Sequence, residues 1–370
     1  MAVSLVSTGV TFPDSSTQTT AATGFGFKNR IINGAMVIDQ RNAGASVTLT
    51  AANDVYPVDR LGAYASTDGT MTAQQSSTAP AGFTKSVVFT TTVADSSLGA
   101  TQRCTAFQRI EGYNVADLGF GTASASTVTL SFWVRSSLTG TFGASLIGAS
   151  YARSYPFNYT ISAANTWEQK TVTIAGDTSG TWLTTNGVGL VVLFNLGSGS
   201  NYLGTANAWA AGELYAPTGS TSVIGTLNAT WQVTGVQLEK GSTATSFDYR
   251  PYGTELALCQ RYCFVYSYAN TSSAYGSIII GRANTTTMTN GPFTLPVPMR
   301  ITPTLSWSGS FSDIDTGASG TSITANGARS TNIQMFLSAT FSSGTVTVGN
   351  ASYINANNST TWYGIFSSEL

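Results

Sequence analysis

Apolar and polar residues alternate along Thr127-Val-Thr-Leu-Ser-Phe-Trp-Val-Arg-Ser136. The same period of two recurs in residues 166–174 and 231–239. Because successive side chains of a strand point to opposite faces, these stretches predict half-buried antiparallel strands. Similar runs, separated by Gly, Asn and Ser, fill residues 31–250 without helical periodicity. The sequence therefore predicts an all-β fold built around a two-sheet sandwich of jelly-roll type.

The periodicity changes once, at residues 253–262. Apolar and polar spacings of three and four there, at Leu256, Cys259, Gln260 and Cys263, predict one short linker helix. Pro251 lies just ahead of it and marks a boundary between two domains. Strand patterns resume after the helix, at residues 292–300, 302–307, 333–340 and 363–366. They predict a smaller C-terminal β-sandwich.

Three parts are therefore expected: an N-terminal extended attachment segment (1–29), the jelly-roll domain (30–252), and the short helix with the C-terminal β-sandwich (253–370). The first part is rich in Ser and Thr and ends in Gly24-Phe-Gly-Phe27. It is too short for a core of its own, and its backbone amides need partners. If ordered, it must pair with another chain or surface, and the alternative is a frayed terminus.

Charged residues are scarce. Lys, Arg, Asp and Glu make up 9% of the 370 residues, the net charge is −1, and histidine is absent. A chain without a basic face is a poor nucleic-acid binder, and one without imidazole has neither a Ser-His-Asp triad nor a His-ligated zinc site. Ser and Thr, which supply polarity without charge, account for more than a quarter of the chain.

The longest apolar runs, residues 187–194 and 277–280, have the length of buried strands, so membrane insertion is not expected. The first residues carry no pattern of a secretory signal. The chain has three cysteines, Cys104, Cys259 and Cys263, an odd number that cannot all pair in disulfides within the chain. Both features favour synthesis in a reducing cytosol, with the cysteines as small buried apolar residues.

Several stretches near the N-terminus have a characteristic sequence. They are Gly9-Val-Thr-Phe-Pro-Asp14 with residues 17–22, then Asn29-Arg-Ile-Ile-Asn-Gly-Ala-Met36, Asp39-Gln-Arg41 and Tyr56-Pro-Val-Asp-Arg60. These stretches resemble the tail-fibre and related virion proteins of tailed bacteriophages. The first pair is similar to a phage attachment segment. The others are similar to the entry of a phage jelly-roll that itself resembles carbohydrate-binding modules. Family members often have Trp after the last Asp-Arg, but this chain has Leu61, so no role of that aromatic is carried over.

The most specific match lies at the domain boundary. It comprises Thr234-Gly-Val-Gln-Leu-Glu-Lys-Gly241, Ala244-Thr-Ser-Phe247, Arg250 and Glu255-Leu-Ala-Leu-Cys-Gln-Arg-Tyr262. The C-terminal stretches 295–300, 302–304 and Ser368-Glu-Leu370 are also similar to the family. The resemblance implies that 255–262 is a junction between domains and not an active site.

Catalytic and metal-binding candidates are few. Asp54 with Asp59, and Asp313 with Asp315, could in principle act as glycosidase pairs, but turns of β proteins commonly carry Asp and catalysis is not favoured. Asp313-Ile-Asp315 lacks the Gly and distal Glu of a Ca²⁺ loop. A structural Ca²⁺ is the open alternative to a plain turn there, and no cofactor is indicated. Cys259 and Cys263 could touch a metal or each other, although buried packing is favoured.

Saccharide recognition needs flat aromatic faces beside neutral donors and acceptors. Two loops are rich in both, and their candidate contacts are Tyr151, Arg153, Tyr155, Asn158 and Tyr159 in the first, and Tyr202 and Trp209 in the second. The alternative is that these aromatic rings pack beneath the loops.

Together with the resemblance, these observations predict a non-enzymatic phage virion protein, a homotrimeric tail fibre that adheres to host surface polysaccharide. Its partners would be two further copies of itself and, through residues 1–29, other virion proteins. A purely structural capsid decoration or a connector between baseplate and fibre is the alternative function.

Overall fold

The computed structural model describes residues 28–268 and 274–370, together with the backbone of three short N-terminal strands, β1 (Ser4–Val6), β2 (Gly9–Thr11) and β3 (Thr17–Gln18), which pair antiparallel. The predicted attachment role of residues 1–29 falls almost entirely outside the described residues. The described part contains one α-helix and is otherwise built from strands and short 3₁₀ turns, which confirms the all-β fold class. No helix in that part has the length and apolar character needed to span a bilayer.

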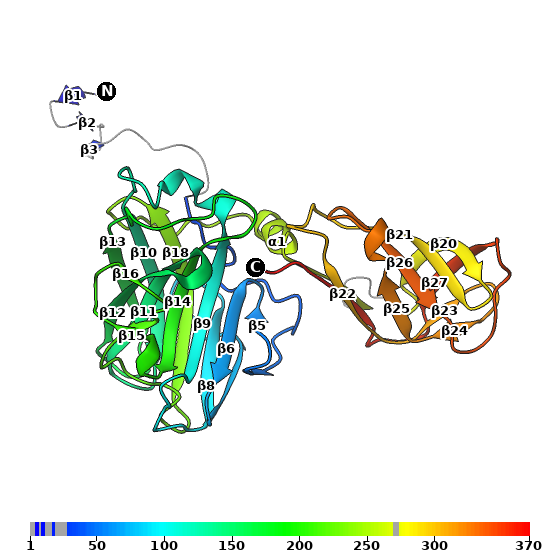
Figure 1. The fold of residues 1–370 in the computed structure, drawn as a ribbon, viewed down its shortest axis with the longest axis horizontal. Helices are drawn as coiled ribbons and strands as arrows, with labels where there is room; N and C mark the ends of the chain where they lie inside the picture. The colour runs from blue at the N-terminus through cyan, green and yellow to red at the C-terminus, as the bar shows by residue number, and fades with distance from the viewer. Residues whose placement is uncertain (1–3, 7–8, 12–16, 19–27, 269–273) are drawn as a thin grey trace.

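Two antiparallel sheets form the first sandwich (Figure 1). The six-stranded sheet runs in the order β13 (Glu168–Ile174), β10 (Val128–Ser136), β18 (Thr230–Lys240), β8 (Ser86–Val93), β7 (Thr70–Ser76) and β4 (Val47–Thr48). The seven-stranded sheet runs in the order β16 (Ala210–Ala211), β12 (Arg153–Ile161), β11 (Gly140–Gly148), β14 (Val188–Ser198), β9 (Arg103–Glu111), β6 (Leu61–Ser66) and β5 (Val55–Val58). The chain crosses repeatedly from one sheet to the other, as in a jelly roll.

The inner faces of these sheets share one core. Phe132 of β10 and Trp231 of β18 both meet Phe194 of β14, with ring centroids 5.0 and 5.2 Å apart. Aromatic pairs at such distances add favourable packing to the burial of their apolar surface. The alternation read from the sequence thus selects the residues that fill the space between the sheets.

The predicted half-burial holds for only one of the three strands on which it was based. Strand β13 alternates between inner and outer positions, but β10 and β18 are buried on most of both faces. For β18 the reason is that residues 241–249 fold back over its outer face. The backbone N–H of Thr245 donates to Glu239 Oε1 at 2.8 Å, and that of Asp248 donates to Gln237 Oε1 at 2.8 Å.

The second sandwich follows the helix. Its three-stranded sheet has the order β19 (Cys263–Ser267), β28 (Tyr363–Ser367) and β22 (Thr304–Ser308). Its seven-stranded sheet has the order β24 (Ser319–Gly320), β23 (Phe311–Asp313), β27 (Ala351–Ala356), β20 (Ser277–Thr285), β21 (Met288–Thr294), β26 (Gln334–Thr340) and β25 (Ser322–Ala325). A separate core fills it, in which Phe293 stacks on Phe366 with centroids 4.9 Å apart.

One strand ends earlier than the sequence predicts. The pattern at residues 292–300 predicts a continuous strand, whereas β21 ends at Thr294 and residues 295–300 are irregular. Pro296 and Pro298 lack the N–H that a strand needs to continue its ladder, which accounts for the difference.

The helix α1 (Tyr252–Gln260) lies between the two sandwiches, close to the C-terminus (Figure 1). Cys259 and Tyr262 pack against Ile32 and Ile38 of the first sandwich in a small separate core. All three cysteines are buried and unpaired, and burial raises the pKa of each thiol. The structure thus shows Cys259 and Cys263 as buried free thiols, and Cys259 packs in the small core described above.

Buried ion pairs join the second sandwich to the first. Glu111, at the end of β9, accepts hydrogen bonds from Arg261 Nη2 at 2.6 Å, Arg261 Nε at 2.9 Å and Tyr262 Oη at 2.7 Å. Burial alone would raise the pKa of Glu111, but these hydrogen bonds outweigh it and lower the pKa. At the chain end, Glu369 pairs with Arg41 at 2.9 Å and also with Arg60.

Glu111→Ala tests this connection. The change leaves Arg261 and the Tyr262 hydroxyl without their acceptor, so the free energy of unfolding should fall by about 3 kcal/mol, as measured by urea denaturation. Asp117→Ala is the matched control, because Asp117 pairs with Arg30 at the surface. That exposed pair should contribute less than about 1 kcal/mol. Equal losses in the two variants would contradict a structural role for Glu111.

Candidate functional site

The outer face of the seven-stranded sheet in the first sandwich carries a hollow lined by aromatic and charged side chains. We call it the tyrosine groove, and its volume is about 180 Å³. Its lining residues are Asp54, Tyr64, Arg103, Thr105, Phe107, Arg109, Tyr151, Leu193, Glu213 and Tyr215.

Strand β9 supplies the floor of the groove. Its core-facing residues Cys104, Ala106 and Ile110 alternate with the outward-facing residues between them, so Arg103 and Arg109 project from the same face. Tyr64, on the adjacent strand β6, lies directly opposite Thr105 in the ladder. Further walls come from the turn η3 (Ala149–Tyr151) and from the loop that follows η4 (Ser200–Tyr202).

Arg103 is surrounded by tyrosines. Its guanidinium lies 4.7 Å from the ring centroid of Tyr64, 5.0 Å from that of Tyr202 and 5.8 Å from that of Tyr215. Its Nη1 donates to Tyr202 Oη. No carboxylate of the described residues lies within ion-pair distance of this guanidinium, so several of its N–H groups remain to bind a ligand.

Arg109, in contrast, forms an ion pair with a carboxylate of the protein. Its Nη1 donates to Asp54 Oδ2 at 2.6 Å and to the Leu370 carbonyl at 2.9 Å, and its Nε donates to Tyr151 Oη at 3.1 Å. This arginine therefore holds one end of the groove together and ties it to the C-terminus.

Tyr215 remains a neutral group. Burial and then its hydrogen bond to Glu213 raise the pKa of the Tyr215 phenol well above its usual value. Its ring stacks on that of Tyr202 with centroids 4.7 Å apart and planes 5° apart. The groove thus offers phenol groups and one arginine without a carboxylate partner, a set suited to a ligand rich in oxygen atoms.

The structure divides the seven residues predicted as saccharide contacts. Tyr151 and Tyr202 are brought together at the tyrosine groove. Sequence reasoning missed Tyr64, Arg103 and Tyr215, which complete it. The alternation along β9 was a usable signal for Arg103, but the strand order that places Tyr64 beside it was not readable from the sequence.

Trp209 and Tyr155 lie in a different cluster. Their rings are 5.3 Å apart, and Trp209 also meets Trp182 at 5.5 Å and Phe120 at 5.9 Å. The Trp209 indole N–H donates to the Ala175 carbonyl at 2.7 Å. These half-buried rings pack against the core, which agrees with the alternative that such aromatics lie beneath loops. A glycan contact at either residue stays a prediction.

Three remaining candidates differ in their surroundings. Arg153 forms a bidentate ion pair with Asp177 at 2.6 and 2.8 Å, and Asn158 is exposed on β12. Tyr159 was predicted wrongly as a surface contact. It is buried in the core, where its hydroxyl accepts a hydrogen bond from Trp231 Nε1 at 3.0 Å and its ring stacks near Phe142.

The candidate carboxylate pairs have structural partners. Asp54 binds Arg109, and Asp59 is 1% exposed with both oxygens accepting hydrogen bonds from Gln40. Burial raises the pKa of Asp59 to about 6, against the opposing influence of Arg41. A carboxyl so enclosed cannot reach a substrate, so this pair is not a hydrolytic site.

Asp313 and Asp315 form a turn. Asp313 Oδ1 accepts the backbone N–H of Asp315 at 3.2 Å and of Thr316 at 2.9 Å, while Oδ2 accepts from Ser352 Oγ at 2.5 Å. Carboxylate bonds of this kind stabilise tight turns. Across residues 28–268 and 274–370, no three His, Cys, Asp or Glu side chains are grouped to hold a metal ion.

No family model and no curated protein sequence matches the chain. Among solved structures, a putative sugar binding protein from Bacteroides thetaiotaomicron is 11% identical to this chain, with a TM-score of 0.35. The match covers 58% of this chain and 100% of the Bacteroides chain. The family 11 carbohydrate-binding module from Clostridium thermocellum is 10% identical, with a TM-score of 0.28, over 55% of this chain and 100% of its own. The enzymatically active domain of tailspike protein 4 from bacteriophage CBA120 is 11% identical, with a TM-score of 0.32, over 58% of this chain. The match spans 21% of that tailspike chain. At these scores the similarities assign no ligand or partner to this chain.

Asp59→Asn tests the buried carboxyl. A folded-state pKa of about 6, above the value of 3.8 for a free Asp, means that the proton on Asp59 stabilises the fold. That contribution is complete below about pH 4 and is lost as the pH rises through 6. The stability of the wild type relative to the Asn variant should therefore fall by up to about 3 kcal/mol between pH 4 and 7.

Chemical denaturation across this pH range measures the difference. The same substitution at Asp68, an exposed residue, controls for the loss of one negative charge. A constant difference between wild type and Asp59→Asn would contradict a protonated Asp59 in the fold.

Proposed function

We propose that the chain is a non-enzymatic virion protein of a tailed bacteriophage, a homotrimeric tail fibre whose tyrosine groove binds saccharides of the host surface. The observation that carries the binding role is Arg103, whose guanidinium lies among three tyrosines without a carboxylate partner in the described residues. The virion assignment is supported by the resemblance of residues 9–14, 29–41 and 234–262 to phage fibre proteins.

The chemistry of the groove suits a sugar. Hydroxyl groups of a saccharide can accept hydrogen bonds from Arg103 and exchange hydrogen bonds with the Tyr151 and Tyr202 phenols. Hydrogen bonds from a guanidinium are stronger than those from neutral donors, and a carboxylated sugar would gain most from them.

Strong adhesion would require several copies of the groove to bind at the same time. A small groove gives a single contact of about millimolar affinity, but three copies on one particle make the second contact intramolecular. The Ser-rich and Thr-rich surface is consistent with this role, because neutral polar groups bind sugars without the desolvation of ion pairs.

A specific observation favours the second candidate, a purely structural capsid decoration or connector protein. Tyr202 and Tyr215 stack on each other, and Arg103 covers Tyr64, so these groups satisfy one another without a ligand. In that case the groove would only fix the loop containing Tyr215 to the sheet.

Arg103→Ala distinguishes the two functions. On an array of bacterial surface polysaccharides, the variant should lose about tenfold or more of the wild-type binding, because hydrogen bonds from a charged donor contribute about 1.5–3 kcal/mol. Arg103→Lys keeps the positive charge but lacks the planar guanidinium with its paired N–H donors, so this variant should lose only part of the wild-type polysaccharide binding.

Arg282→Ala is the matched control, since it removes an exposed arginine from β20 in the second sandwich. It should bind as the wild type does. Adhesion through the groove is refuted if Arg103→Ala also binds as the wild type does, and a wild-type trimer that binds no polysaccharide would favour the structural function.

Light scattering tests the oligomeric state on its own. The purified chain should have three times the mass of one chain, because the avidity argument needs several copies on one axis. The mass of a single chain across the micromolar range would contradict the trimer and leave each groove to act alone.

A further inference from the structure

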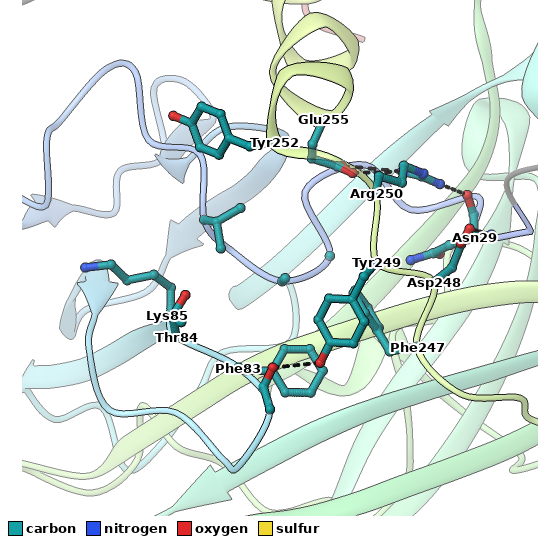
Figure 2. A pocket seen from close by; sticks show the side chains of 14 residues that line it. Asn29, Phe83, Thr84, Lys85, Phe247, Asp248, Tyr249, Arg250, Tyr252 and Glu255 are labelled. Carbon is teal, nitrogen blue, oxygen red and sulfur yellow. Dashed lines mark hydrogen bonds and ion pairs between the residues drawn. The ribbon is translucent and has the colours of Figure 1, made fainter.

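A second cavity lies where residues 29–37, the loop at 82–85 and residues 247–255 meet (Figure 2). We call it the aromatic cavity. Its volume is about 470 Å³, and ligand-binding pockets usually measure about 300–1,000 Å³. It shares no lining residue with the tyrosine groove. Its lining residues are Asn29, Gly34, Ala35, Val37, Gly82, Phe83, Thr84, Lys85, Phe247, Asp248, Tyr249, Arg250, Tyr252 and Glu255.

Aromatic rings build one wall of the cavity. Phe83, Phe247 and Tyr249 contact one another with ring centroids 4.8 to 5.5 Å apart, and Tyr249 Oη donates to the Gly82 carbonyl at 2.7 Å. These contacts hold the wall in place without a ligand. Tyr249 and Tyr252 are nevertheless 59% and 63% exposed, so ring surface remains uncovered beside the hollow. Flat, uncovered rings of this kind suit a ligand that is itself a flat apolar ring.

Two other lining residues are small. The Gly34 carbonyl accepts the backbone N–H of Val236 on β18 at 3.0 Å. A Cβ atom at Gly34 would lie 2.2 Å from the Val236 carbonyl oxygen, so the backbone can approach β18 only with glycine here. Ala35 is partly exposed and lines the cavity, so a larger side chain at this position would extend into the space that a ligand needs.

The two carboxylates of the lining already have partners. Asp248 Oδ2 accepts the backbone N–H of Asn29 at 3.2 Å, and Glu255 pairs with Arg250 at 3.3 Å. Figure 2 shows these groups on the side of the cavity away from Lys85. This arrangement disfavours a cation as the ligand, because both carboxylates have hydrogen-bonding partners in the protein.

Lys85 differs from the other lysines of the chain. Lys28, Lys170 and Lys240 each donate from Nζ to a neighbouring oxygen atom at 2.6 to 2.7 Å. Lys85 lines the cavity and is only partly exposed, yet its Nζ forms no hydrogen bond or ion pair with the described residues. An ammonium group in this position can pair with an anionic group of a ligand.

We propose that the aromatic cavity binds a small aromatic anion, with its ring against Tyr249 and Tyr252 and its anionic group paired with Lys85. Apolar ring surface provides most of the binding free energy in such a site, and the single cation selects the charge of the ligand. The carboxylates of Asp248 and Glu255 reinforce the orientation, because they repel an anionic group from the other side. Binding here is independent of the saccharide role proposed for the tyrosine groove.

Two fluorescent probes that differ by one charged group test the site. Both 8-anilinonaphthalene-1-sulfonate and the neutral N-phenyl-1-naphthylamine brighten in apolar surroundings, and they share one ring system. In Lys85→Gln, the affinity for the sulfonate probe should fall about fivefold, as expected for the loss of one partly exposed ion pair. The affinity for the neutral probe should stay within about twofold of the wild type. Arg282→Gln is the matched control, because it removes one positive charge from β20 in the second sandwich and should leave both affinities unchanged.

Ala35→Leu locates both probes, since the added side chain takes up part of the cavity and should lower both affinities about tenfold. Tyr252→Ser changes an exposed residue and should weaken both probes about threefold without unfolding the chain. The proposal is overturned if the wild type binds neither probe, or if Lys85→Gln binds the sulfonate probe as the wild type does. It is also overturned if Arg103→Ala, and not Lys85→Gln, weakens the sulfonate probe, because the anion would then occupy the tyrosine groove.

Discussion

The relative position of the two sandwiches depends on one buried carboxylate, that of Glu111. It lies at the end of β9 and receives three hydrogen bonds from Arg261 and Tyr262, which directly follow α1. A buried charge is tolerated only where such partners are complete, so any shift of the helix would leave Glu111 unpaired at a cost of several kcal/mol. Within the stretch Glu255-Leu-Ala-Leu-Cys-Gln-Arg-Tyr262, four side chains contact the first sandwich: Glu255, Cys259, Arg261 and Tyr262.

The chain has few charged residues, and several of them hold the two sandwiches together as Glu111 does. Arg41, Arg60 and Glu369 form buried ion pairs between the C-terminal residues and the first sandwich. Arg300 fixes the same residues through the Ser368 and Glu369 carbonyls at 2.7 Å each. Few charges are left for other roles. Arg103 differs from the other arginines in that its guanidinium lies among three tyrosine rings, and it forms no ion pair with a carboxylate of the described residues.

Local sequence patterns predicted most strands and the single helix, because the spacing of apolar residues and the positions of turn-forming residues can be read directly from the sequence. They failed where distant segments meet. The full burial of β18 depends on the fold-back of residues 241–249, and the inward position of Tyr159 depends on the core across from β12. For the same reason, the sequence predicted only part of the tyrosine groove. Tyr151 and Tyr202 lie in loops rich in aromatic residues, which the sequence shows. Tyr64 and Arg103 are neighbours only because β6 pairs with β9.

Strand β9 connects the candidate site to the junction. Arg103, Arg109 and Glu111 occupy alternate positions on its outer face, so the groove and the contact with Arg261 share one rigid ladder. Arg109 strengthens the link, since one guanidinium binds Asp54, Tyr151 and the Leu370 carbonyl. A displacement of the second sandwich would therefore disturb the contacts of Leu370 and Glu111 together, and Arg109 is the groove residue that it would affect first. Arg103 lies at the other end of β9, farthest from these contacts along the strand.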